Sequence, residues 1–192
     1  MNHSLLLVPG SNVTRVTAQE HQATSVRLLA DLPPLVKAVA LMRWREWGDE
    51  IGREHPGWWI EATRRAAGQG ALPVSWVAVD EGGSLLGAVG LGQFDIDERR
   101  DRSPWVLGMI VHPAHRRRGV GRMLLSELEV FAASDGHPRV WAATGDPGRE
   151  FYTRCGWTFV ERLIRRDDSQ RVNVLVKELA PTHPRRAREP SS

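Results

Sequence analysis

The chain is poor in the residues that cross-link a protein, hold a metal or enter a membrane. Its 192 residues include one cysteine, Cys155, so no disulfide can form within the chain, which fits a reducing compartment. No apolar run has the length of a membrane span, and the apolar residues 5–8 are too few for the core of a signal peptide. The histidines lie scattered, without metal-ligand spacing. We therefore expect a cytoplasmic protein that binds no metal and no membrane.

An excess of charge of one sign is also lacking in the part of the chain that we expect to fold. The net charge is +3, but three arginines and one glutamate in residues 181–192 supply +2 of it, which leaves +1 for the rest. A nucleic-acid-binding protein usually has a broad basic face, so we expect no nucleic-acid partner. The 41% hydrophobic content suits one core. We predict an N-terminal extension at residues 1–23, one domain at 24–180 and a disordered basic tail at 181–192.

The most strongly patterned stretch reads as a strand followed by a helix. Trp105–Val111 is an almost unbroken apolar run, which is typical of a central strand covered on both faces. After a turn, Val120, Leu124 and Leu128 recur at helical spacing and form one apolar face. The pattern predicts a helix that packs back on a sheet.

Between this strand and helix lies a basic, glycine-containing turn, residues 116–122, with the sequence R-R-R-G-V-G-R. Its cations lie where the positive end of the helix dipole is expected, which is unfavourable unless an anion binds there. Gly119 and Gly121 would let the backbone approach a phosphate closely. The alternative is a solvated arginine run that opens a surface helix. The turn matches neither the nucleotide triphosphate loop nor the dinucleotide fingerprint.

Two motifs carry a resemblance to a known family. The first covers residues 111–121, V-H-P-x-x-R-x-x-G-x-G, and the second covers residues 151–157, F-Y-x-x-C-G-W. In this order they resemble the acyl-CoA-binding and Phe-Tyr-x-x-x-Gly-Phe motifs of the GNAT superfamily of N-acyltransferases, and the resemblance covers roughly residues 24–180. It implies an α/β (α+β) fold, with a mixed, mostly antiparallel sheet of six or seven strands and helices on both faces. It also implies acetyl-CoA as co-substrate.

The other expected elements agree with such a fold. Alternating strands and helices, with a hairpin at each end, themselves favour a mixed sheet with helices on both faces. A short edge strand is possible at residues 5–8. We expect strands at residues 24–30, 73–79, 84–91, 139–144, 157–164 and 171–179. We expect helices after Pro33-Pro34, with Leu35, Val39 and Met42 on the apolar face, at residues 58–67, and at 149–154 after a turn at 145–148.

The resemblance assigns the cofactor-binding residues. In the family, the strand before the basic turn parts from its neighbour, and its free backbone groups pair with the pantetheine arm while the turn holds the phosphates. By this resemblance Met109, Ile110 and Val111 would hold pantetheine. The phosphates would be held by Arg116, Arg117, Arg118, Gly119, Val120, Gly121 and Arg122. Gly108 fits a bulge that would help the strands to part, and a glycine admitted for tight packing is the alternative.

Acyl transfer to an amine needs a neutral amine, a donor for the oxyanion and a proton for the departing thiolate. A backbone N–H at Ile110 or Val111 would face the oxyanion. Tyr152 is the only tyrosine of the chain, and the resemblance makes it the proton donor; the alternative is a packed ring with a hydrogen-bonded hydroxyl. Where the family commonly has asparagine and alanine, this chain has Gly145 and Gly148, so contacts there would come from Asp146 or the backbone.

The general base and the acceptor are less defined. Candidate bases are Asp95, Asp97 and Glu98 in the charged loop of residues 93–103, and Glu46 or Asp49 near the end of the first helix. Together these carboxylates would form an acidic rim, which favours a cationic acceptor such as an aminoglycoside, a polyamine or a peptide amine. The cluster Trp44, Trp47, Trp58 and Trp59 is either an aromatic wall for the acceptor or part of the core.

These observations favour an N-acetyltransferase that moves an acetyl group from acetyl-CoA to the primary amine of a small molecule by direct transfer in a ternary complex. An acetyltransferase acting on protein or peptide amines is an alternative. A non-catalytic acyl-CoA-binding regulatory module is another. Nucleic-acid binding through the arginine turn and the tail ranks below all of these, and its mark would be a strongly salt-dependent affinity.

Overall fold

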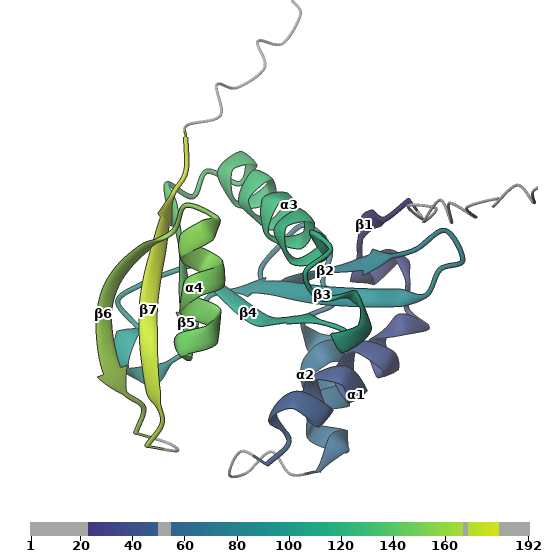
Figure 1. The fold of residues 1–192 in the computed structure, drawn as a ribbon, viewed down its shortest axis with the longest axis horizontal. Helices are drawn as coiled ribbons and strands as arrows, with labels where there is room; N and C mark the ends of the chain where they lie inside the picture. The colour runs from purple at the N-terminus through teal and green to yellow at the C-terminus, as the bar shows by residue number, and fades with distance from the viewer. Residues whose placement is uncertain (1–22, 50–54, 167–168, 181–192) are drawn as a thin grey trace, which may run out of the picture.

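Figure 1 shows the computed structural model, which describes residues 23–49, 55–166 and 169–180. The expected strand at residues 5–8, all but the last residue of the predicted extension, and the predicted tail lie outside the described residues. No described helix is both long and apolar enough to span a bilayer.

A seven-stranded sheet forms the centre of the protein, in the order β1-β2-β3-β4-β5-β7-β6. Every neighbouring pair is antiparallel except β4 and β5, which are parallel. All six side chains of β2 are buried, as expected for a strand covered on both faces whose sequence is apolar except at Ser75. The strands are β1 Ser25–Leu28, β2 Val74–Val79, β3 Leu85–Gly92, β4 Trp105–Val111, β5 Arg139–Thr144, β6 Thr158–Ile164 and β7 Arg171–Glu178.

Among the described residues, four helices cover the two faces of the sheet. Figure 1 places α1 (Leu35–Trp47) and α2 (Pro56–Arg65) on one face, and α3 (Val120–Ser134) and α4 (Asp146–Arg154) on the other. Three short 3-10 turns, Leu29–Asp31, Asp97–Arg99 and Pro113–His115, join the larger elements. The mixed, mostly antiparallel sheet with helices on both faces is therefore confirmed.

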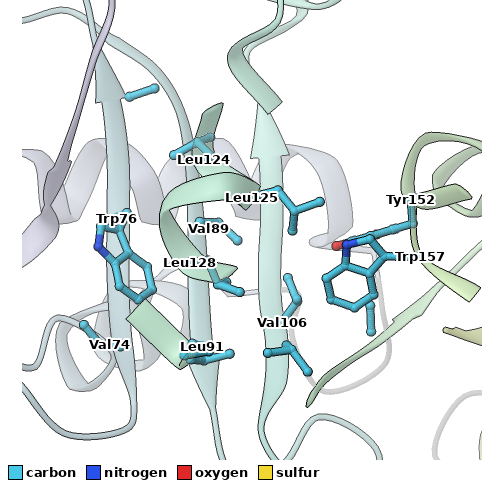
Figure 2. Packing of buried hydrophobic residues seen from close by; sticks show 14 of the residues in the cluster. Val74, Trp76, Val89, Leu91, Val106, Leu124, Leu125, Leu128, Tyr152 and Trp157 are labelled. Atoms are coloured by element: carbon cyan, nitrogen blue, oxygen red, sulfur yellow. The ribbon is translucent and has the colours of Figure 1, made fainter. Parts of the chain in front are cut away.

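Each face of the sheet has its own core. On one face, Leu124 and Leu128 of α3 lie over Trp76, Val89 and their neighbours, as Figure 2 shows. On the opposite face, the predicted apolar stripe of α1 packs on the sheet through a second set of buried residues: Val39, Met42, Val77, Ala88 and Ile110. Each fully buried side chain of this kind stabilises the fold by about 1.5–3 kcal/mol relative to an exposed one.

Two helix starts differ from the expected ones for identifiable reasons. α2 begins at Pro56 rather than at residue 58, because the His55 Nδ1 accepts a hydrogen bond of 3.0 Å from the Gly57 N–H and caps the helix. The predicted turn at residues 145–148 is wrong, because α4 already begins at Asp146. Pro147 fits the first helical turn, where a missing N–H costs no hydrogen bond. The first strand is also shorter than expected and passes into a 3-10 turn at Leu29.

Candidate active site

Strands β4 and β5 part in the middle of the sheet. They pair only at Trp105 and Trp141, and the N–H of Trp141 donates to the Pro104 carbonyl at 2.9 Å. Beyond this point the remainder of β4 has β3 on one side and, among the described strands, no partner on the other. Backbone groups on that open side are available to a ligand that runs along the strand.

A bulge in β4 accompanies the parting. Ala88 lies opposite Ile110 and Gly90 opposite Leu107, so two residues of β4, Gly108 and Met109, face one residue of β3. Gly108 has φ of +51°, which favours glycine, and a Cβ there would lie 2.7 Å from the Arg43 Nε. Both sequence interpretations of Gly108 therefore hold, because it is a bulge residue and a site of close packing.

The basic turn after β4 is held in an open conformation. The His112 Nδ1 accepts a hydrogen bond of 3.3 Å from the Ala114 N–H and orders the 3-10 turn, and Arg117 and Gly119 then take φ of 65° and 85°. In the described part of the chain, the N–H groups of residues 117–119 donate to no other backbone group. They join the free N–H groups of the first turn of α3, which form an anion-binding end.

Arg116 ties this turn to the opposite face of the cleft. Its Nε donates to the Val111 carbonyl at 3.0 Å, and its Nη2 forms an ion pair of 2.9 Å with Glu46 of α1. The pair is partly exposed and contributes little to stability. Its position matters more, since it links the proposed phosphate turn to the helix that lies under β4.

A cleft of about 940 Å³ follows the gap between β4 and β5 and reaches across to α1 and α2. Eight of the predicted cofactor residues line it: Met109, Ile110, Val111, Arg116, Arg117, Gly119, Gly121 and Arg122. Arg118 is exposed and does not line it. Val120 does not line it either, because its side chain is buried in the core under α3.

Tyr152 lines the cleft from α4 and is almost fully buried, with 5% of its surface exposed. Its ring makes edge contacts with Phe151 and Trp157, at centroid distances of 5.4 and 5.0 Å, and Figure 2 shows it beside Trp157. Burial, and after it the negative charge of Asp95 and, at high pH, that of the Cys155 thiolate, raise the pKa of Tyr152 above its ordinary value. The hydroxyl therefore stays protonated at neutral pH.

The expected acidic rim does not form as a group. Only Glu46 and Asp95 of the five candidate bases line the cleft, and Glu46 is paired with Arg116. Asp97 pairs with its helical neighbour Arg100, the Glu98 side chain accepts a hydrogen bond from the Arg166 N–H, and Asp49 lies exposed outside the cleft. Six arginines line the cleft against these two carboxylates, so its overall charge is positive.

The departures from the family motif near α4 are explained by packing. Gly145 caps α4 and lines the cleft with its backbone. A Cβ at Gly148 would lie 1.9 Å from the Thr144 Oγ1, so the helix can approach β5 only with glycine there. Asp146 faces elsewhere, because its Oδ1 accepts hydrogen bonds from Arg162 and Asn173 at 2.7 and 2.9 Å.

Arg43 lines the cleft from α1, although it is not among the site residues predicted from the sequence. The signal was available, because Arg43 follows Val39 by four residues and Met42 by one and so shares their apolar face. A charged residue in that position is buried with the apolar ones. Of the aromatic cluster, Trp47, Trp58 and Trp59 line the cleft near it, and Trp47 stacks on Trp59 at 6.1 Å.

The described residues contain no group of three or more His, Cys, Asp or Glu side chains able to hold a metal ion. The single cysteine, Cys155, is partly exposed, and burial is the main reason that the pKa of its thiol is raised.

Known proteins resemble the chain in sequence and in fold. The model of the "Acetyltransferase (GNAT) family" matches residues 38–157. A curated mycothiol acetyltransferase from Kineococcus radiotolerans is 41% identical over 59 residues, which are 30% of this chain and 19% of that protein, so the match spans about a fifth of the relative's length.

Solved structures share the fold over most of their length. An aminoglycoside 6′-N-acetyltransferase complexed with coenzyme A gives a TM-score of 0.65 at 16% identity, over 83% of this chain and 99% of that one. An acetyltransferase described as a GNAT family member from Desulfovibrio desulfuricans gives 0.63 at 21% identity, over 82% and 100%. At these identities the likeness shows a common fold, which agrees with the predicted architecture.

Proposed function

Because this chain belongs to the acetyltransferase (GNAT) family, we propose that it transfers the acetyl group of acetyl-CoA to the primary amine of a small molecule, within a ternary complex. The observation that carries the proposal is the cleft at the parting of β4 and β5. It combines an unpaired strand side with an anion-binding turn at the end of the same strand, and a ligand with a polar arm and phosphates requires both. Residues 24–180 are the proposed catalytic unit, and one cysteine suits a cytoplasmic setting.

Acetyl-CoA would lie along the open side of β4 with its phosphates on the turn. The His112 N–H donates to the Leu86 carbonyl on the β3 side at 2.8 Å. Since successive residues of a strand alternate their hydrogen-bonding sides, the backbone N–H group of Val111 faces the open side of β4 and that of Ile110 faces β3. The Val111 N–H would pair with pantetheine or with the thioester oxygen, a role for which Ile110 is on the wrong side. Arg117, Arg122 and the N–H groups of residues 117–119 would hold the phosphates.

The reaction joins the amine nitrogen to the acetyl carbon. The neutral amine attacks the thioester carbonyl, a C–N bond forms and the C–S bond breaks. The nitrogen loses a proton and the CoA sulfur gains one, so the products are the N-acetylated amine and CoA. A preorganised backbone N–H stabilises the oxyanion that develops on the carbonyl oxygen.

Tyr152 is the proposed proton donor to the sulfur. Its raised pKa keeps the hydroxyl protonated, and its near-complete burial excludes water from the departing thiolate. A phenol that is less acidic than the thiol gives a strong hydrogen bond to the thiolate, and full proton transfer then depends on the proton released by the amine. Asp95 is the proposed acceptor of that amine proton, since it lines the cleft and its charge acts on Tyr152.

The test is release of CoA from acetyl-CoA, followed as free thiol, with a panel of aminoglycosides, polyamines, amino acids and peptides with free N-termini. Turnover above hydrolysis with one class, and its loss in Tyr152→Phe with unchanged acetyl-CoA affinity, is the expected result. Tight acetyl-CoA binding without turnover on any amine would overturn the proposal and favour the non-catalytic module.

A further inference from the structure

The acceptor half of the cleft contains a buried cation with an unused donor. Arg43 is 6% exposed and lies on α1 under the bulge of β4. Its Nε donates to the Gly108 carbonyl at 3.0 Å, and its Nη1 lies 3.5 Å from the Thr63 Oγ1 of α2. Its Nη2 is buried and has no hydrogen-bond partner among the described residues. A buried guanidinium nitrogen without a hydrogen-bond partner lowers the stability of the folded protein.

Arg43 also lacks a counter-ion in the described part of the chain. Two other partly buried arginines, Arg99 and Arg102, are paired there with Glu161. Arg43 instead has a carbonyl and a distant hydroxyl. Desolvation lowers its pKa to about 10, so it remains charged at neutral pH. A buried charge that stays ionised without a partner is unfavourable, and a negative group of a bound molecule would balance it.

The position of Arg43 indicates which bound molecule would supply the negative group that balances its charge. Arg43 lines the cleft from α1, and its Nε donates to the carbonyl of Gly108 in β4, the strand whose open side would hold the thioester. The Trp58 ring, 45% exposed, and the buried Trp59 line the same region from α2. An anion on Nη2 would therefore belong to the acceptor molecule, with an apolar part of that molecule against the tryptophan.

We propose that Arg43 binds a carboxylate carried by the acceptor, so that the substrates are amines with a nearby carboxylate and an apolar side group, such as apolar amino acids. This inference rests on the proposed function and names its substrate class. A carboxylate suits the site because the planar guanidinium offers Nη2, and the Thr63 hydroxyl can donate its own proton while it accepts from Nη1. The same positive charge opposes a polycationic acceptor, and it favours the neutral form of a nearby amine, which is the form that attacks.

The experiment compares matched acceptors that differ only in the charged group. Free thiol release gives kcat/KM for L-phenylalanine against L-phenylalaninamide, and for L-leucine against L-leucinamide. The proteins are the wild type, Arg43→Met, and Arg45→Met as a control from the exposed side of the same helix. The wild type and Arg45→Met are expected to prefer the carboxylate by roughly ten- to hundredfold, as a charge-assisted hydrogen bond predicts, and Arg43→Met is expected to lose this preference.

Binding gives a second readout that does not need turnover. In calorimetry with CoA present, N-acetylphenylalanine should bind the wild type more tightly than N-acetylphenylalaninamide, and the difference should vanish in Arg43→Met. Turnover of amides as fast as acids by the wild type would overturn the inference and leave the proposed function standing. No turnover, with the carboxylate preference still seen in binding, would overturn the function and leave the anion site. If Arg43→Met does not fold, the wild-type acid-to-amide ratios decide alone.

Discussion

The two halves of the cleft carry positive charge in opposite ways. On the proposed cofactor side, Arg117 and Arg122 are exposed, and their guanidinium groups keep their water. On the proposed acceptor side, Arg43 is buried against Gly108 and has already lost its water. Hydrated cations attract a polyanion together and are screened by salt, whereas a desolvated cation fixed in place selects one group of one geometry. The difference suggests that one half is built for attraction and the other for discrimination.

The largest effect on activity is expected from Tyr152, which lies between the two halves of the cleft. Tyr152→Phe removes the hydroxyl but keeps the ring between Phe151 and Trp157, so kcat should fall by about a hundredfold or more, the usual weight of a general acid. Dissociation constants for CoA and for the acceptor should stay unchanged, which separates chemistry from both binding halves. Steady-state kinetics with calorimetry measures this. An unaltered kcat would remove Tyr152 from the mechanism.

Gly108→Ala should damage the acceptor half. The φ of +51° and the contact of 2.7 Å with the Arg43 Nε both oppose a Cβ, and backbone strain alone costs about 1–2 kcal/mol, or about 2–8 °C in Tm. The KM of the acceptor should also rise as Arg43 shifts. Differential scanning calorimetry and kinetics measure both quantities.

Gly83→Ala is the matched control for that change. Gly83 has φ of +78° in a turn, and nothing lies within 4 Å of the position that a Cβ would take there. Gly83→Ala therefore measures the cost of backbone strain alone, without a steric contact. Equal losses of Tm in the two variants, with unchanged acceptor KM in both, would show that Arg43 does not depend on Gly108.

Arg122→Met should affect the cofactor half alone. The loss of one charge-assisted phosphate contact raises the KM of acetyl-CoA by about tenfold and flattens its dependence on salt. Kinetics at low and high ionic strength measures this, with Arg27→Met on the distant strand β1 as control. The acceptor's carboxylate preference should be unaltered in both. A similar loss in Arg27→Met would mean that only the overall charge matters.

The smallest effect concerns stability and pH. Arg43→Met removes a desolvated charge but leaves the Gly108 carbonyl without its donor, so the variant should be more stable than the wild type by about 1 kcal/mol at pH 7. Because folding lowers the pKa of Arg43 to about 10 from 12.5, the unfolded state binds more protons between these values. As the pH rises from about 10 to 12.5, the free energy of unfolding of the wild type therefore rises relative to that of the variant. The variant's advantage in stability should shrink over the same range. Urea unfolding at pH 7 and above pH 10 measures the difference, and a constant difference would contradict the lowered pKa.

Local patterns predicted the strand, turn and helix on the proposed cofactor side of the cleft well. The strand Trp105–Val111, the turn and the helix from Val120 follow one another in the chain, and their periodicity contains most of what determines them. Most of the predicted cofactor residues line the cleft. Val120 was assigned by its place in the motif, while its side chain follows the apolar pattern into the core.

The acceptor half depends on contacts between distant residues, which local patterns do not contain. Arg99 of the charged loop pairs with Glu161 of β6, 62 residues away. Apart from Asp95, which lines the cleft, the loop's carboxylates therefore do not gather around the cleft. The role of Arg43 depends on its contact with Gly108, which lies 65 residues later in the chain and meets α1 only in the folded protein. Helix α4 was placed too late because a glycine and a proline at its start resemble a turn until their place at the helix end is known.

The single pairing of Trp105 with Trp141 makes the sheet two half-sheets, β1–β4 and β5–β7, joined at one point. A ligand that pairs with the open side of β4 would replace the missing hydrogen bonds between the strands and would connect the two half-sheets. Loading should therefore slow amide hydrogen exchange in β5 as well as in β4. At a hundredfold excess over Kd it should add about 2.7 kcal/mol to the free energy of unfolding. In a cell, the supply of acetyl-CoA would then help to determine how long the folded protein survives proteolysis.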